Sequence, residues 1–337
     1  MTEEKPANTP RFHGLKIECD AVGLKQLNET ADGRFRVGAE GVEMMATTGD
    51  HKVEFVGWET HTLAHVRSGM GYPAYYPVEP VEVTDKLVAV LMDLDGTTIR
   101  SEEFWIWIIE QTTASLLGDT KFSLEDSDLP FVSGHSVSEH LSYCISKYCV
   151  GKSLKEARGY YFEHTHREMD AIMQGHGRPN AFTPCEGVKE FLLELKAAGV
   201  SIGLVTSGLY EKAWPEILDG FKTLGMGSPE TFYDTIITAG FPLRNGAAGT
   251  LGELSPKPHP WLYAEACRVG LGIDFQQRHQ VVGIEDSAAG VCASRIAGFA
   301  TYGLTGGNIV DGGAQALCHR YVDGFESLMQ DLRVRLS

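Results

Sequence analysis

The stretch from Leu87 to Thr98 constrains the fold of this chain more than any other. Six apolar residues, Leu87 to Met92, run directly into Asp93-Leu94-Asp95-Gly96-Thr97. An apolar run of this length that ends at acids and glycine predicts a strand buried on both faces of a parallel sheet. Asp93 would then be placed to attack an electrophile or bind a metal, and Asp95 to move a proton. A strand followed by a solvated acidic turn fits the same pattern, so support must come from elsewhere in the chain.

Polar groups also follow predicted strands in the second half of the chain. The strand at 201–205 ends in Thr206-Ser207-Gly208. These small side chains at a helix start suit a phosphate, although an ordinary helix cap fits equally well. Lys257 stands between prolines, which limit the freedom of its loop. The apolar residues 281–284 lead into Glu285 and Asp286, and further strands are predicted at 235–238 and 299–302.

The carboxyl ends of parallel strands meet at one edge of a sheet, so we expect these separated features to converge there. Asp93, Asp286 and a backbone carbonyl near Asp95 are predicted to offer oxygen ligands to Mg²⁺, which usually takes one or two carboxylates and substrate phosphate. Lys257 would offset the negative charge gathered at this edge.

A helical block is predicted between the first of these strands and the next. Residues 101–117 place Phe104, Trp105 and Ile108 at helical spacing, and further helices are predicted at 137–148 and 154–173. Such an insertion fits either a mobile cap over an active site or a purely structural addition. A later helix, near 188–196, has apolar residues on one face, namely Val188, Phe191, Leu192 and Leu195.

The region from Arg11 to Pro80 has a different pattern. Short runs of alternating polarity, such as 34–37 and 53–56, are separated by Gly, Asn and Asp, which predicts a β-rich unit. The proline-spaced segment 72–80 is predicted to be a linker between domains. His61 and His65 are more consistent with ordinary histidines on a strand than with a metal site. No function is legible in this region.

Composition excludes several classes of partner. The formal net charge of -16 argues against a nucleic-acid or anionic-membrane surface, because such surfaces need basic residues. The seven cysteines show no paired spacing, so free thiols in a reducing compartment are expected. The polar first ten residues and the absence of a long apolar run predict neither a signal peptide nor a membrane span, and the cytoplasm is the expected location.

Taken together, four motifs resemble those of the haloacid dehalogenase superfamily, in the β-phosphoglucomutase-like branch with a helical C1-type cap. The motifs are Asp93-Leu94-Asp95-Gly96-Thr97, Thr206-Ser207-Gly208, Lys257-Pro258 and the stretch from Gly283 to Gly290. They stand in family order, and the likeness covers about 86–332. The resemblance implies a Rossmann-like α/β core at 83–103 and 181–337, a cap at 104–180, and a β-rich N-terminal domain at 1–82 outside the likeness.

The resemblance also implies a role for each site residue. Asp93 would be the nucleophile and a Mg²⁺ ligand, and Asp95 the general acid and base that also lends its carbonyl to the metal. Thr206, Ser207 and Gly208 would bind the transferring phosphoryl group, and Lys257 would fix it against Asp93. Asp286 would complete the metal site, with Glu285 as a second acid acting directly or through water. The chemistry would pass through an aspartyl-phosphate.

Departures from the family pattern favour a phosphatase over a sugar phosphomutase. Asp95 makes cleavage of carbon–halogen or carbon–phosphorus bonds improbable. Trp105 stands where the mutases carry a histidine, and Val137 where an arginine would hold a second phosphate. Arg100 would partly compensate, and His135 is the cap residue expected to meet substrate.

The sequence therefore predicts a Mg²⁺-dependent phosphatase acting on a small phosphomonoester such as a sugar or polyol phosphate. The alternatives are a β-phosphoglucomutase-like enzyme and a non-catalytic scaffold that carries an N-terminal binding module. The expected partner is a small phosphorylated substrate, with neither nucleic acid nor membrane, and a homo-oligomer through the N-terminal domain remains open.

Overall fold

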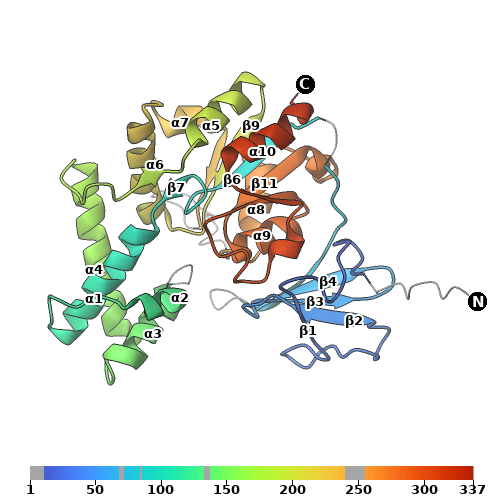
Figure 1. Cartoon of the computed structure of the whole chain (residues 1–337), viewed down its shortest axis with the longest axis horizontal. Helices are drawn as coiled ribbons and strands as arrows, with labels where there is room; N and C mark the ends of the chain where they lie inside the picture. The colour runs from blue at the N-terminus through green and yellow to red at the C-terminus, as the bar shows by residue number, and fades with distance from the viewer. Residues whose placement is uncertain (1–10, 68–71, 84–85, 133–136, 240–254, 337) are drawn as a thin grey trace, which may run out of the picture.

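The computed structural model describes residues 11–67, 72–83, 86–132, 137–239 and 255–336. A six-stranded parallel sheet lies at the centre of the larger part of the molecule, with helices on both faces (Figure 1). From edge to edge its strands are β10 (Thr235–Ile237), β9 (Ser201–Val205), β6 (Ala89–Asp93), β11 (Val281–Glu285), β12 (Ala300–Leu304) and β13 (Arg320–Val322). The predicted α/β class with a parallel sheet is confirmed.

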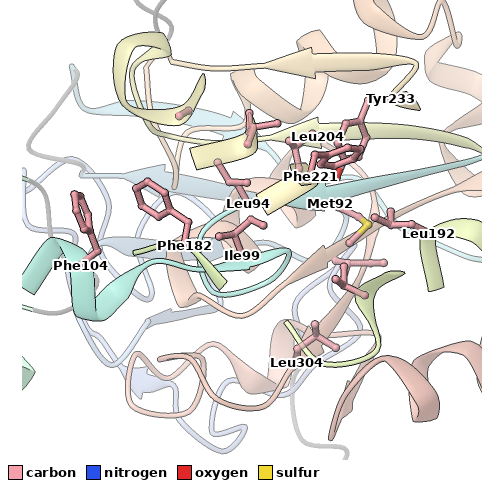
Figure 2. Close-up of a cluster of buried hydrophobic side chains, with 14 of the residues drawn as sticks. Met92, Leu94, Ile99, Phe104, Phe182, Leu192, Leu204, Phe221, Tyr233 and Leu304 are labelled. Carbon is pink, nitrogen blue, oxygen red and sulfur yellow. The ribbon is translucent and has the colours of Figure 1, made fainter. Parts of the chain in front are cut away.

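Strand β6 lies in the middle of this sheet and is buried along its whole length. Val90 and Met92 point into the cluster on one face, and Ala89 and Leu91 belong to the cluster on the other. Figure 2 shows Met92 together with Leu204 of β9, covered by Leu192 and Phe221 from helices. Burial on both faces explains why the strand reads as continuously apolar.

Helices cover the two faces of the sheet. Those of the core are α5 (Val188–Ala197), α6 (Tyr210–Leu224), α7 (Pro229–Phe232), α8 (Trp261–Glu265), α9 (Ala288–Ile296) and α10 (Phe325–Leu332). All of the apolar positions predicted for one face of α5 are buried. Helix α8, which begins at Trp261, is short and continues as a π-helical turn at Ala266–Gly270.

A group of helices, here called the cap helices, lies to one side of the core (green in Figure 1). They are α1 (Glu102–Leu117), α2 (Leu129–Val132), α3 (Val137–Tyr148) and α4 (Leu154–Met173). The predicted ranges 137–148 and 154–173 agree with α3 and α4. The two chain segments that connect these helices to the core pair as short antiparallel strands, β7 (Ile99–Arg100) and β8 (Thr183–Pro184).

The N-terminal region forms an antiparallel five-stranded sheet in sequential order. Its strands are β1 (Lys25–Gln26), β2 (Met44–Thr47), β3 (Val53–Gly57), β4 (Thr62–Val66) and β5 (Ala74–Pro77). The β-rich prediction is confirmed, but the run at 34–37 is not a strand and makes only an isolated bridge between Arg36 and Glu29.

The prediction of a linker at 72–80 is wrong, because β5 lies inside it and pairs with β4. Prolines suggested a boundary, but an edge strand has one side without sheet partners and therefore tolerates them. The chain leaves this sheet only after Pro77.

One face of the N-terminal sheet packs directly against the core. Phe55, Ala64 and Val66 share a buried cluster with Val291 and Ile296 of α9. The backbone N–H of Gly49 also donates to the carbonyl of Gly312 at 2.9 Å. The N-terminal sheet is thus continuous with the core through a shared apolar layer.

Within the described ranges, no helix has both the length and the apolar character needed to cross a membrane.

Candidate active site

Asp93 occupies the end of β6, at the carboxyl edge of the parallel sheet. It is level with Val205, the last residue of β9, so Thr206 follows at the same edge. The Thr98 hydroxyl donates to the carbonyl of Asp93 at 2.6 Å and closes the turn. Gly96 has a φ of 82°, and a Cβ there would lie 2.1 Å from Asp286 Oδ2. Glycine is therefore required for the turn to approach the second acidic strand end.

Lys257 reaches this edge from the loop before α8, and its side chain is only 6% exposed. Its Nζ donates to Asp93 Oδ1, to Glu285 Oε1 at 2.6 Å and to the carbonyl of Val205 at 3.3 Å. The backbone N–H of Lys257 donates to Ser207 Oγ at 3.1 Å. One lysine thus connects three of the strand ends that the sequence predicted to converge.

Glu285 and Asp286 lie at the end of β11, next to β6. The Glu285 carboxylate accepts from Tyr263 Oη at 2.5 Å and from Ser287 Oγ at 3.0 Å, in addition to Lys257. Asp286 Oδ1 accepts from Thr97 Oγ1 at 3.3 Å. Glu285 is therefore surrounded by donors, whereas Asp286 has a single weak one among the hydrogen bonds of the described residues.

The side chains of Asp93, Glu285 and Asp286 bring carboxylate oxygens within 4.8 Å of one another, and all of them are buried. Burial, together with the charge of Glu285, raises the pKa of Asp93 well above its usual value. The same causes raise the pKa of Asp286 to about 8. Burial alone would lower the pKa of Lys257, but the charges of Asp93 and Glu285 raise it. The edge thus holds more buried carboxyl groups than one lysine can balance when all of them are ionised.

Asp95 faces the same edge and has donors on both carboxylate oxygens. Ser101 Oγ donates to Oδ1 at 2.8 Å and Thr206 Oγ1 to Oδ2 at 3.2 Å. Thr206 Oγ1 in turn accepts from the backbone N–H of Gly208 at 2.9 Å. Asp95, two residues after the end of β6, is therefore held in a fixed orientation against Thr206, which follows β9.

The remaining predicted residues are placed differently. Ser207 is exposed and Gly208 half-buried beside Thr206, so the predicted phosphate cradle borders the acids. Arg100 is exposed in β7, at the junction with the cap helices. His135 lies outside the described residues. His65 is buried and pairs with Glu54 through a 2.7 Å hydrogen bond, as expected for an ordinary histidine in a strand.

Sequence reasoning missed two residues that border the site, Tyr263 and Glu216. The contact of Tyr263 with the site could not be predicted from the sequence, because an aromatic residue in a short helix is expected to pack in the hydrophobic core. Glu216 is buried within α6, and burial, together with the charge of Asp95, raises its pKa well above the usual value. A detectable signal was present, since Glu216 interrupts the apolar stripe formed by Ala213, Ile217 and Gly220.

Comparisons with known proteins agree with this geometry. The sequence profile of the haloacid dehalogenase-like hydrolases matches residues 90–238. Pyrophosphatase PpaX from Bacillus velezensis is 30% identical over 224 residues, which cover 66% of this chain and 85% of that protein.

Solved structures share the fold. A predicted phosphoglycolate phosphatase from Haemophilus somnus has a TM-score of 0.55 at 18% identity, covering 73% of this chain and 97% of that one. A Thermotoga maritima protein assigned as a β-phosphoglucomutase has a TM-score of 0.52 at 22% identity, covering 73% and 99%. The profile match and the relative at 30% identity show that the chain belongs to the haloacid dehalogenase-like hydrolase family, and the acids and lysine gathered at one sheet edge agree with this.

Proposed function

We propose that the protein is a Mg²⁺-dependent phosphatase that hydrolyses a small phosphomonoester through an aspartyl-phosphate on Asp93. The observation that carries this proposal is the position of Asp93, which ends the central strand between Lys257 and the acids of β11. A carboxylate held against a lysine at the ligand-binding edge of an α/β sheet suits nucleophilic attack on a phosphoryl group.

The donor set fits a magnesium ion. Hard carboxylate oxygens are the ligands that Mg²⁺ prefers, and a divalent cation would balance the charge that raises the pKa values of Asp93 and Asp286. Asp93, Asp286 and the carbonyl of Asp95 would hold the ion, with Glu285 as a second acid. When bound, the ion would neutralise charge on the phosphoryl oxygens.

The residues at the sheet edge would then have separate roles in a two-step reaction. In the first step a bond forms between Asp93 Oδ and phosphorus, the ester P–O bond breaks, and Asp95 gives a proton to the leaving oxygen. In the second step Asp95 takes a proton from water, the water oxygen bonds to phosphorus, and the bond to Asp93 breaks. Lys257 would hold the phosphoryl group against Asp93, and Thr206 and Ser207 would bind its oxygens.

The residues where the cap helices meet the core favour hydrolysis over mutase chemistry. Lys212 Nζ lies 3.6 Å from the centroid of the Trp105 ring and donates to Tyr161 Oη at 3.1 Å. Trp105, which stands where the mutases carry a histidine, is therefore an aromatic residue with the Lys212 ammonium already lying over its ring. Val137, where an arginine would hold a second phosphate, is a half-buried apolar residue at the start of α3.

We also propose domain bounds, a substrate class, a cellular location and an assembly state for the enzyme. We place the core at 83–103 and 181–337, the cap at 104–180 and the N-terminal domain at 1–82. The substrate would be a small phosphorylated molecule, met in the cytoplasm and bound in part by Arg100 and His135. Assembly into a homo-oligomer through the N-terminal domain would show as a doubled mass in light scattering.

The test is phosphate release from a panel of sugar, polyol and nucleotide monophosphates, phosphoglycolate and pyrophosphate, with and without Mg²⁺. The wild type is compared with Asp93→Asn, and isomerisation of sugar 1-phosphates is followed in parallel with trace glucose 1,6-bisphosphate. Release that requires both Mg²⁺ and Asp93 supports the phosphatase. Isomerisation without release would move the assignment to a mutase, and inactivity throughout would favour the scaffold.

A further inference from the structure

A tyrosine of the N-terminal sheet contacts the loop that carries Lys257. Tyr76, in the edge strand β5, has its hydroxyl 2.8 Å from His259 Nδ1 and 3.1 Å from Trp261 Nε1. Its ring meets both partner rings edge-on, with interplanar angles of 78° and 75°. The contact joins positions more than 180 residues apart, and it falls on the segment that follows the active-site lysine.

The direction of one of these two hydrogen bonds follows from the donors available. The indole N–H of Trp261 can only donate, so Tyr76 Oη accepts from it. Tyr76 Oη and His259 Nδ1 share one further hydrogen, and the tautomer of His259 decides which of the two atoms donates it. His259 is 1% exposed, and burial lowers its pKa, which favours the neutral ring. In either case the Tyr76 hydroxyl links Trp261 and His259 on the segment that follows Lys257.

The same loop is held from its other side by the candidate active site. The Lys257 backbone N–H donates to Ser207, and Lys257 Nζ donates to Asp93 and Glu285. A further backbone bond, from the His259 N–H to the carbonyl of Pro256 at 3.1 Å, closes the turn around Lys257. A displacement of His259 would therefore pass directly to the ammonium group that faces the nucleophile.

The N-terminal sheet also supports the second acidic strand end. Helix α9 begins directly after Asp286 and Ser287, and its Val291 and Cys292 share the buried apolar layer with β2, β3 and β4. The buried guanidinium of Arg295, near the end of α9, donates to the carbonyl of Gly14 at 3.3 Å. This face of the sheet is thus occupied by the core, and it supports both loops that bring charge to the candidate active site.

We propose that the N-terminal sheet is a positioning element of the active site, and that Tyr76 is the residue through which it fixes the Lys257 loop. The inference rests on the proposed phosphatase function and gives the N-terminal region a role within it. Within the part of the chain that the structure describes, no hydrogen bond joins Tyr76 to Asp93 or Asp95, so it acts through the Lys257 loop, chiefly by way of His259. Because a small misplacement of a charged group near the reacting atoms strongly slows a reaction, loss of this support should lower turnover more than substrate binding.

The test compares Tyr76→Phe with Tyr75→Phe, a matched control on the same strand. Tyr75 donates its hydroxyl to Asp32 on the other face of the sheet, at 2.9 Å, away from the Lys257 loop. Each variant loses one hydroxyl and keeps its ring. We expect Tyr76→Phe to lower kcat by about 10-fold with little change in KM, and Tyr75→Phe to leave both unchanged.

Hydrogen exchange of the peptide 255–263 gives a second readout that needs no activity. It should become about tenfold faster in Tyr76→Phe and stay unchanged in Tyr75→Phe. Unchanged exchange in Tyr76→Phe, or faster exchange with unchanged kcat, would overturn the inference. A wild type that is silent on the whole phosphate panel would instead contradict the proposed function, while the exchange result still decides whether Tyr76 orders the loop.

A double-mutant cycle tests the route through His259. If Tyr76 acts through this side chain, Tyr76→Phe should cause no further loss of kcat in a His259→Gln background. Additive losses would contradict that route. Should Tyr76→Phe fail to fold, Trp261→Phe removes the donor to the same hydroxyl at a half-exposed position and is expected to give a smaller loss in the same direction.

Discussion

Two buried aspartates in this molecule have pKa values that are shifted in opposite directions. Asp128, in the short helical turn before α2, accepts from Lys147 Nζ at 2.5 Å, from Tyr143 Oη at 2.6 Å and from Tyr148 Oη. Burial alone would raise the pKa of Asp128, but the hydrogen bonds from Lys147 and the tyrosines lower it below its usual value. Asp93 has Lys257 but also two acidic neighbours, and its pKa is raised.

The difference separates a carboxylate that stabilises the fold from one that awaits a ligand. Asp128 has enough donors to satisfy its charge, so its ionised form belongs to the folded state. At the sheet edge, Asp93, Glu285 and Asp286 are buried around one lysine, which pairs with Asp93 and Glu285, so the remaining charge has to be neutralised by a proton or by a cation. An uncompensated buried acid in a ligand-binding position indicates a functional site.

The largest expected effect comes from Asp93→Asn. Removal of the proposed nucleophile should lower phosphate release by at least about 10³-fold. The same change should raise the melting temperature of the Mg²⁺-free protein at pH 7, because a raised pKa means that folding disfavours the ionised carboxylate. Phosphate-release assays and thermal unfolding measure the two effects.

Asp128→Asn is the matched control for that variant. It should lower the melting temperature and leave the activity of the folded enzyme unchanged. A destabilised Asp93→Asn, or an inactive but folded Asp128→Asn, would remove the distinction between the two sites.

A smaller effect on activity is expected from Lys257→Met. The variant leaves Asp93 and Glu285 buried without their cation, which should cost about 3–5 kcal/mol of unfolding free energy without Mg²⁺. Phosphate release should fall by about 10²-fold. Urea unfolding with and without Mg²⁺ checks the stability, and Mg²⁺ should restore part of it. Full stability in the absence of Mg²⁺ would show that the acids are not ionised together with the lysine.

The smallest effect concerns only the stability of the cap helices. Asp128→Asn should lose about 1–3 kcal/mol at pH 7, because the charge-assisted hydrogen bonds weaken. Asp128 has a lowered pKa in the folded state, so its contribution is present above the unfolded pKa of about 3.9 and is lost as the pH falls through the folded value. The gap between wild type and variant should therefore shrink as the pH falls below about 4. A gap that is independent of pH would contradict this assignment.

Much of the core was predictable from the sequence because its signals are local. The uninterrupted apolar run before Asp93 indicates a strand buried on both faces, and the rule that parallel strands end at one edge brings Thr206, Lys257 and Asp286 to it. The helices α3 and α4 were predicted with the bounds that the structure shows, because their turns contain clear breakers such as Gly151.

What the sequence did not reveal depends on contacts between distant segments. The prolines around Tyr75 and Tyr76 suggested a linker, because nothing local shows that this segment is an edge strand paired with β4. The hydrogen bonds of Tyr263 to Glu285 and of Tyr76 to His259 join different elements of the fold, and no spacing rule predicts them.

The most direct test of the account is a Mg²⁺ titration followed by thermal unfolding, using wild type, Asp286→Asn and Asp128→Asn. If the acids of the sheet edge hold the ion, Mg²⁺ at a hundred times its dissociation constant should stabilise the wild type by about 2.7 kcal/mol. Asp128→Asn should show the same gain, and Asp286→Asn should lose most of it. A wild type that gains no stability from Mg²⁺, or an Asp286→Asn variant that gains as much as the wild type, would contradict the claim that this edge is a magnesium site.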